Sequence, residues 1–197
     1  MIHRLYERRL RRCITSVPDH LCIMLTEEEL REAPDQLVRV VEWCVELQIP
    51  QVTFHVSTDD PGHLGALMDG VRSVASVARL RIFCERELWY EGGRGIAVDV
   101  AVGTSGREEV TRAIRRMAAE GIPPEEITEE TIEDHLTFPY EPDLVIKTGG
   151  SYLTDFLIWQ SVYAELLFLD INWPLLRKVD FLRALRDYQD RSRRFGT

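Results

Sequence analysis

The feature that most constrains the fold is the alternation of short apolar segments with longer segments of helical periodicity. The apolar, β-rich runs have the length of buried strands and cover 20–25, 51–56, 80–84, 96–102 and 144–146. Strands that alternate with helices form a mostly parallel central sheet with helices on both faces. We therefore predict an α/β fold in a single domain, 1–197. Its function should lie at the carboxyl ends of the strands, near Thr26, Ser57, Val102 and Thr148.

Helical spacing of apolar residues predicts the elements between these strands. The expected helices cover 5–14, 34–47, 105–120, a stretch from Thr128 on, 154–168 and 179–194. Ser105 and Glu108 have the spacing of a capping box, and Gly121 would end that helix. The helix over 154–168 is apolar nearly all round, so we expect it to be buried.

The overall charge argues against general nucleic-acid binding, because it is −9 at pH 7. No apolar run approaches the roughly 20 residues of a membrane span, and no signal peptide is visible, so we expect a cytoplasmic protein. The cysteines form no C-x-x-C pair. We interpret them as buried, reduced thiols, at Cys13, Cys22, Cys44 and Cys84.

Basic residues gather at both ends of this acidic chain. They are Arg4, Arg8, Arg9, Arg11 and Arg12 near the start, and Arg177, Lys178, Arg183, Arg186, Arg191, Arg193 and Arg194 near the end. Either the two ends meet something anionic, or they are ordinary solvated helix faces. The first helix could make a peripheral contact with an anionic membrane or pack on the sheet, and we favour packing.

An acidic cluster follows the first predicted strand. The strand 20–25 ends in Thr26 and runs directly into the three glutamates Glu27–Glu29. Since ligands bind at the carboxyl ends of strands in α/β proteins, the cluster is either a metal site or a site that has been emptied. Asp59 and Asp60 follow the second strand and are placed to touch a ligand, although a polar turn explains them equally well.

A later strand end has the composition of an anion site. The stretch PDLVIKTGG passes from a buried strand into Lys147, Gly149 and Gly150, and a helix is expected to open near Thr154. Backbone N–H groups of glycines after a strand can face an anion, and a helix N-terminus adds a positive dipole. The lysine adds a charge suited to phosphate. A plain tight turn is the competing interpretation.

Glu165 lies inside the apolar stretch FLIWQSVYAELLF. A carboxylate within an apolar helix costs on the order of several kcal/mol unless it is paired or binds a metal. A partner arginine or a backbone amide accounts for it, and a metal ion is the alternative.

Taken together, these segments resemble the cis-prenyltransferase family, the undecaprenyl and dehydrodolichyl diphosphate synthases. The resemblance is strongest over DLVIKTGG, FLIWQSVYAELLFLDINWPLL and DFLRALRDYQDRSRRFG, roughly 143–196. A weaker part of the resemblance covers the segments FHVSTDD, LRIF and VAVGTSGREEV. The segment 61–79 matches poorly and looks short, which implies a truncated tunnel for the growing chain.

The resemblance implies a parallel sheet with a dimer interface. It also implies Mg²⁺-assisted condensation of isopentenyl diphosphate onto an allylic diphosphate. Family members carry a D-G-N-x-R-W type loop after the first strand, in which Asp handles the metal and the allylic diphosphate while Gly and Arg hold phosphate oxygens. This chain has LTEEEL there, at 25–30, so all three residues are missing. We therefore interpret the acidic cluster as an emptied site rather than a new metal site.

The family's R-[ST]-[SG]-G-E loop, followed by an Arg and a Ser for isopentenyl diphosphate, is partly kept. Lys147 retains a charge without the bidentate fork of arginine, and Thr154 can stand in for the serine. The second arginine is missing and the loop is one residue shorter. With Gly149 and Gly150, these two residues form the substrate-binding group that the resemblance implies.

The carboxyl-terminal tail keeps another element of the family. In family members, an Arg-x-Gly element of the tail reaches the partner subunit's site and contacts diphosphate. Arg194-Phe195-Gly196 of this chain matches that element. Glu165 matches the interface glutamate of the family. A lost catalytic loop combined with a kept tail resembles the non-catalytic Nogo-B-receptor-type subunits of two-component cis-prenyltransferases.

The first hypothesis is a non-catalytic accessory subunit, inactive alone, of an enzyme that makes long-chain polyprenyl diphosphate for glycosyl-carrier lipids. Its arm, about 179–197, would bring Arg194 and Gly196 to the site of a catalytic partner, in a heterodimer or heterotetramer. Isopentenyl diphosphate would bind at this shared site, and the partner would hold most of the Mg²⁺.

Two alternatives remain open. One is a self-sufficient, divergent cis-prenyltransferase with Mg²⁺ on Asp59, Asp60 or Glu27–Glu29. The other is a non-enzymatic module that binds polyprenyl diphosphate or scaffolds another protein.

Overall fold

The computed structural model describes residues 2–58, 65–84, 87–103, 106–136, 141–149 and 159–195. Its centre is a seven-stranded sheet with the strand order β4-β3-β5-β2-β1-β6-β7. The strands are β1 (His20–Thr26), β2 (Gln51–Ser57), β3 (Arg79–Cys84), β4 (Glu87–Gly92), β5 (Ala97–Val102), β6 (Leu144–Thr148) and β7 (Glu165–Leu169). Neighbouring strands are parallel except β3 and β4. The predicted α/β fold with a mostly parallel sheet is confirmed.

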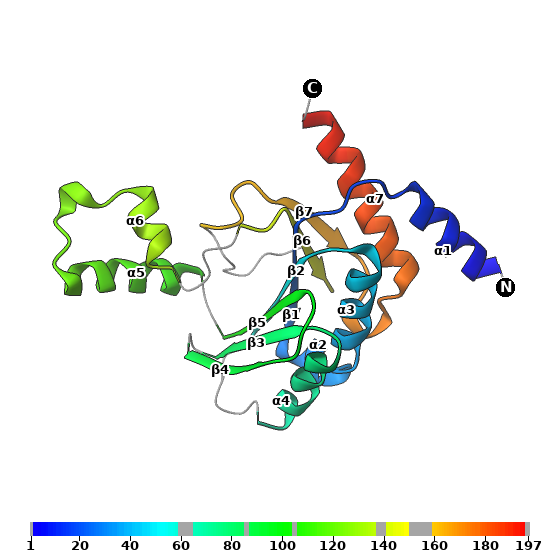
Figure 1. Ribbon diagram of the computed structural model, residues 1–197, viewed down its shortest axis with the longest axis horizontal. Helices are drawn as coiled ribbons and strands as arrows, with labels where there is room; N and C mark the ends of the chain where they lie inside the picture. The colour runs from blue at the N-terminus through cyan, green and yellow to red at the C-terminus, as the bar shows by residue number, and fades with distance from the viewer. Residues whose placement is uncertain are drawn as a thin grey trace.

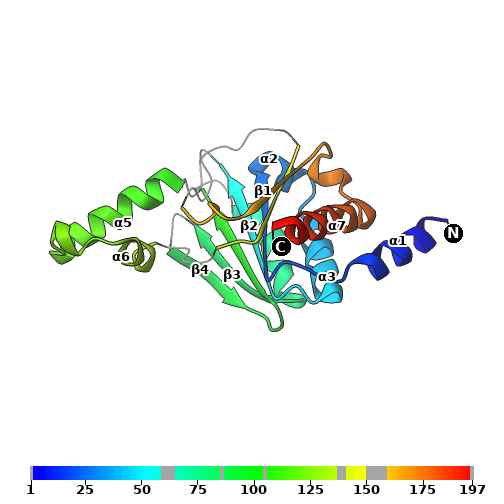
Figure 2. The same ribbon diagram turned by 90° about the horizontal axis from the view of Figure 1, so that it is seen from above.

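Helices surround this sheet unevenly. They are α1 (Ile2–Cys13), α2 (Glu27–Glu32), α3 (Gln36–Leu47), α4 (Gly65–Arg72), α5 (Gly106–Glu120), α6 (Glu129–Asp134) and α7 (Lys178–Phe195), and short 3-10 turns cover Ser73–Ser76, Pro124–Glu126 and Trp173–Leu175. Helices α3, α4 and α7 share one side of the sheet, whereas α5 and α6 project from the body on the other side (Figure 1, Figure 2). Gly121, with φ of 77°, ends α5 as the sequence predicts.

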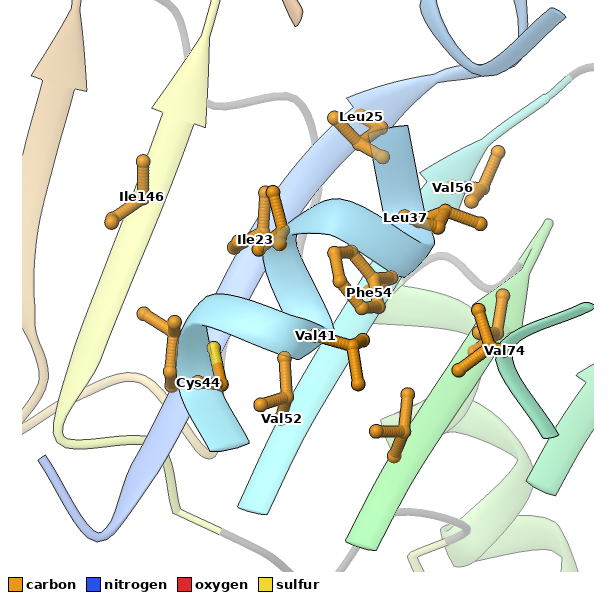
Figure 3. Packing of buried hydrophobic residues seen from close by; sticks show 14 of the residues in the cluster. Ile23, Leu25, Leu37, Val41, Cys44, Val52, Phe54, Val56, Val74 and Ile146 are labelled. Carbon is orange, nitrogen blue, oxygen red and sulfur yellow. The ribbon is translucent and has the colours of Figure 1, made fainter. Parts of the chain in front are cut away.

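The main core lies between the sheet and α3, α4 and α7 (Figure 3). Side chains on β1 alternate, so Ile23 and Leu25 enter this core while Cys22 and Met24 join a smaller cluster on the opposite face. Because both faces of β1 are covered, its sequence is a continuous apolar run rather than an alternating one. Phe54 on β2 lies in the middle of the main core.

Two of the cysteines fit the prediction of buried thiols. Cys22 and Cys44 are buried, and burial raises the pKa of both thiols. Cys13 is exposed and Cys84 is half-buried, so these two do not fit it.

Helix α1 packs on α7 rather than directly on the sheet. Its Leu10 is buried against Val179 and Leu182. Arg11 donates a hydrogen bond from Nη2 to the carbonyl of Glu46, 3.0 Å away. Among the helices of the described residues, none is long and apolar enough to cross a membrane.

The structure differs from the sequence-based expectation in several elements, and helices α2 and α4 are among those that the sequence did not predict. The described part of 154–168 is a turn followed by strand β7, not a helix. A short apolar run can form either a buried strand or a buried helix, and here it pairs in parallel with β6. The antiparallel edge strand β4 was not predicted at all.

Candidate functional site

The strand order places one crevice where ligands are expected. Strands β1 and β6 are neighbours, but the chain leaves β1 towards β2 on one side and leaves β6 towards β7 on the other. Ligands of open α/β sheets bind outside the carboxyl ends of strands at such a reversal. The crevice is bounded by the end of β1 at Thr26 and by the end of β6 at Lys147, Thr148 and Gly149.

The end of β1 passes into helix α2 without a loop. Thr26 is the N-cap of α2, and its side chain accepts a hydrogen bond from the backbone N–H of Glu29 at 3.2 Å. In return, Oε2 of Glu29 accepts from the backbone N–H of Thr26 at 2.9 Å. This is a complete capping box, and it fixes the position of the Glu29 carboxylate at the end of the strand.

The same carboxylate reaches across the crevice to β6. The Thr148 hydroxyl donates to Oε1 of Glu29 at 3.1 Å, and Nζ of Lys147 lies 3.7 Å from Oε2. The two charged side chains are only 11% and 14% exposed, so solvent screens this ion pair weakly. The Glu29 carboxylate therefore occupies the space between the ends of β1 and β6.

Gly149 leaves room for this carboxylate. Its φ is +69°, and a Cβ atom placed on it would lie 2.6 Å from Oε1 of Glu29. A larger residue would therefore clash with the carboxylate as well as be strained. The backbone at the end of β6 is thus shaped for close approach of an oxygen atom, and the protein's own carboxylate supplies that oxygen.

The other two glutamates of the cluster behave differently. Glu27 accepts a hydrogen bond from the Thr58 hydroxyl just past β2 and pairs with Arg31 one helical turn along α2. Glu28 is exposed. Since Glu27 and Glu29 connect α2 to the ends of β2 and β6, the acidic cluster holds three adjacent strand ends together.

Several predicted site residues cannot be placed. Of the proposed substrate-binding group, Lys147 and Gly149 lie in the crevice, whereas Gly150 and Thr154 lie outside the described residues. Asp59 and Asp60 also lie outside them. The role of this group in binding substrate stays a prediction.

The magnesium ion that the resemblance implies has no assembled set of ligands among the described residues at the end of β1. Both carboxylate oxygens of Glu29 are engaged with Thr26, Lys147 and Thr148. Within the described parts of the chain, no group of three or more His, Cys, Asp and Glu side chains could hold a metal ion.

Glu165 lies at the first position of β7, not inside a helix. Its side chain is 26% exposed, and its Oε2 lies 3.4 Å from Nη1 of Arg191 on α7. An arginine partner was the simpler explanation for this residue, and the arginine is present. Its role as a metal ligand stays untested.

The carboxyl-terminal helix ends beside the edge of the sheet. Nη1 of Arg191 also donates to the Leu166 carbonyl of β7 at 3.3 Å. Arg194 lies within the last turn of α7, and Gly196 lies beyond the described residues. Arg191 is therefore held at the β7 edge, and Arg194 follows it within the last turn of the same helix.

This edge carries exposed apolar side chains. Tyr163 is 87% exposed, Val162 67% and Phe168 41%. Strand β7 is the last strand of the sheet, so its outer backbone groups have no neighbouring strand within the described chain. Exposed apolar side chains next to an open sheet edge mark a surface that another protein can cover.

One functional arrangement escaped the sequence-based reasoning. We expected Glu27–Glu29 to repel anions, but did not predict that Glu29 itself pairs with Lys147. A signal was present in the sequence, because Thr26-x-x-Glu29 has the spacing of a capping box. The contact with Lys147, in contrast, depends on the β1–β6 pairing.

Comparison with known proteins identifies the class to which this fold and crevice belong. The family model described as "Putative undecaprenyl diphosphate synthase" matches residues 81–196. An isoprenyl transferase of Thermus thermophilus is 34% identical over 252 residues, which cover 99% of this chain and 95% of the relative. A tritrans,polycis-undecaprenyl-diphosphate synthase of Methanocaldococcus jannaschii is 49% identical over 109 residues, covering 50% of this chain and 39% of that protein.

A solved structure has the same fold. The crystal structure of a probable undecaprenyl diphosphate synthase from Campylobacter jejuni superposes with a TM-score of 0.70 at 21% identity, covering 93% of this chain and 100% of that one. The chain therefore belongs to the cis-prenyltransferase family. It is also shorter than its relative from Thermus thermophilus, since 197 residues align with a stretch of 252.

Proposed function

We propose that this chain is a non-catalytic subunit of a heteromeric cis-prenyltransferase, of the Nogo-B-receptor type. The observation that carries the proposal is the Glu29 carboxylate between Lys147 and Thr148, where a diphosphate-binding enzyme needs cationic groups and open donors. A fixed negative charge there opposes a diphosphate, so the proposal places the Mg²⁺ that the chemistry needs on the partner.

Two further observations support a role beside a partner. The exposed Val162, Tyr163 and Phe168 at the β7 edge form a surface suited to another subunit. Arg191 contacts Glu165 and the Leu166 carbonyl at this edge, so the chain continues from it towards Arg194. A tail that leaves from an interface can contribute residues to a partner's site.

The proposed role is to complete the active site of a catalytic partner. Arg194 and the backbone of Gly196 bind the diphosphate of isopentenyl diphosphate in the partner's site, where the partner holds Mg²⁺. The product is a long-chain polyprenyl diphosphate of the glycosyl-carrier type. The subunits form a heterodimer or heterotetramer.

The second candidate is a self-sufficient cis-prenyltransferase. The named relatives support it more than they support the accessory subunit, because they carry the names of catalytic transferases and one matches nearly the whole chain. In that case the metal ligands are Asp59, Asp60 or other residues outside the described parts. Condensation activity of the purified chain alone separates the two candidates.

The test of the accessory role is the Arg194→Ala variant in a co-expressed pair with a catalytic relative from the same genome. We expect the rate of isopentenyl diphosphate incorporation to fall at least about tenfold, since a charged contact to the diphosphate is lost. Assembly of the pair, followed by size-exclusion chromatography, should stay unchanged. Arg186→Ala, an exposed arginine two helical turns earlier, is the matched control and should keep full activity. Unchanged activity of Arg194→Ala would contradict the role.

A further inference from the structure

We infer that Gln189 is a positioning residue, which fixes the direction in which the end of α7 carries Arg194 towards a partner. Gln189 does so by binding the linker between α1 and β1, residues 14–19, together with the last residue of α1. The inference deepens the proposed function and rests on it, because it names the residue that controls what this chain contributes to the partner's site.

The first argument is the set of hydrogen bonds between Gln189 and a segment far away in the sequence. Oε1 of Gln189 accepts from the backbone N–H groups of Thr15 and Ser16, at 2.6 Å and 3.1 Å. The same oxygen accepts from the Thr15 hydroxyl at 3.1 Å. On the other side of the amide, Nε2 donates to the Cys13 carbonyl at 3.2 Å. The oxygen and the nitrogen of the side-chain amide are thus both matched by the start of the chain.

Burial makes these bonds strict. Gln189 is only 3% exposed, so water cannot easily replace the groups that it binds. The linker 14–19 belongs to no helix or strand, and α1 packs beside α7 through Leu10 and Leu182 (Figure 1). Gln189 therefore fastens α7 to the linker beyond the end of the α1 contact.

The second argument is that α7 is held on two sides near its end. Arg191 lies two residues after Gln189, and two residues correspond to about 200° around a helix. Arg191 contacts Glu165 and the Leu166 carbonyl of β7, on the side away from the linker. The helix thus passes between two contacts before it reaches Arg194, which follows Arg191 by about one turn.

The third argument is the short reach from Gln189 to the end of the helix. Helix α7 ends at Phe195, so the residues after Gln189 make up less than two turns. Short helix ends open readily unless a tertiary contact holds them. A change of direction at Gln189 displaces this whole segment, and displacements of about 1 Å can lower a rate strongly when a binding group is carried along.

The first experiment measures hydrogen exchange in the full chain alone. We expect Gln189→Ala to raise the exchange rate of the amides of 190–195 at least about tenfold, because the end of α7 opens locally. Val179→Ala is the matched control, since it also removes a buried contact of α7, but in the first turn and against Leu10. It should leave exchange over 190–195 as in the wild type. Equal exchange in Gln189→Ala and wild type would overturn the inference.

The second experiment is a double-mutant cycle in the co-expressed pair. Gln189→Ala should lower the rate of isopentenyl diphosphate incorporation at least about threefold while Arg194 is present, because the contact that it positions is weakened. In the Arg194→Ala background the same substitution should have no further effect. Equal losses in both backgrounds would mean that Gln189 acts only through stability, and would contradict the inference.

A second variant keeps both tests decisive if Gln189→Ala does not fold. Gln189→Glu keeps an acceptor for Thr15 and Ser16 and loses only the donor to the Cys13 carbonyl. It should give smaller changes in the same direction, and a folded Gln189→Glu with unchanged exchange and rate would contradict the inference.

The two experiments also separate this inference from the proposed function. Polyprenyl diphosphate made by the chain alone would remove the proposed function, and hydrogen exchange would still decide whether Gln189 holds the end of α7. Unchanged exchange, in contrast, would remove the positioning role of Gln189 and leave the proposed contact of Arg194 in place.

Discussion

The carboxyl end of β1 and the outer edge at β7 differ in whether their side chains and backbone groups have partners within the described chain. At the end of β1, Glu29 engages the backbone of Thr26, the Thr148 hydroxyl and the Lys147 ammonium group. At the β7 edge, Tyr163 and Phe168 are exposed and no described strand pairs with the outer side of β7.

This difference indicates where the chain can act. A site that binds a ligand must keep donors, charges or apolar surface unsatisfied until the ligand arrives. Among the described residues, the charged and polar groups of the crevice bind one another, whereas the edge retains exposed apolar side chains. The proposed function accordingly assigns the activity of the chain to this edge rather than to its own crevice.

The largest effect should come from removing the support beneath the filled crevice. Trp173 is fully buried, stacks edge-on against Phe54 with ring centroids 6.1 Å apart, and donates from Nε1 to the Ala33 carbonyl. Trp173→Ala should lower the free energy of unfolding by about 3–5 kcal/mol, measured by urea denaturation. Leu175→Ala, in the same 3-10 turn but 69% exposed, should change it by less than about 0.5 kcal/mol. Similar losses for the two variants would remove the contrast between buried support and exposed surface.

The next effect should appear at the β7 edge and only in the complex. Tyr163→Glu places a charge at the most exposed of these apolar positions, so affinity for the catalytic partner should fall by on the order of 2 kcal/mol, or about thirtyfold. Titration calorimetry with the partner measures it, and the melting temperature of the isolated chain should stay the same. Leu175→Glu is the control at an exposed apolar position elsewhere. Equal affinity of Tyr163→Glu and wild type would mean that the partner binds another surface.

A smaller effect should distinguish the glutamates of α2. Glu29→Ala removes one half of the capping box and the partner of Lys147, so it should cost about 1–2 kcal/mol of stability. Glu28→Ala, next to it and exposed, should stay within about 0.5 kcal/mol of the wild type. Urea denaturation of both variants makes the comparison. If Glu28→Ala cost as much, the crevice would not depend on Glu29 in particular.

The smallest effect concerns the amino end of β1, opposite the crevice. His20 is buried, its Nε2 lies 2.9 Å from the Thr53 hydroxyl, and burial lowers its pKa. The unfolded chain, in which the pKa is about 6.5, then binds the proton more readily than the folded chain. Stability should therefore decrease as the pH falls below about 6.5, and His20→Gln should remove this part of the decrease. Urea denaturation at about pH 7.5 and about pH 5.5 tests it, and an equal decrease in the variant would exclude His20 as its source.

The sequence predicts the sheet well because buried parallel strands are continuous apolar runs of limited length. β1, β2 and β6 begin within a residue of their predicted positions. It fails at β7, where the run ELLFL could have been buried by a helix or by a strand. Only the pairing with β6 decides between these two structures.

The candidate site was predictable in location but not in its contacts. The rule on strand ends places function near Thr26 and Thr148, and both border the crevice. The pairing of Glu29 with Lys147 joins residues far apart in the sequence, so local patterns carry no sign of it. It follows from the parallel register of β1 and β6, in which Met24 is opposite Lys147.

The most direct test is an incorporation assay with labelled isopentenyl diphosphate, a short allylic primer and Mg²⁺. It compares this chain alone, a catalytic family member from the same genome alone, and the co-expressed pair. The proposed accessory role predicts no activity of this chain alone and strongly raised activity of the pair. Polyprenyl diphosphate made by the purified chain alone would contradict the account and establish a self-sufficient transferase.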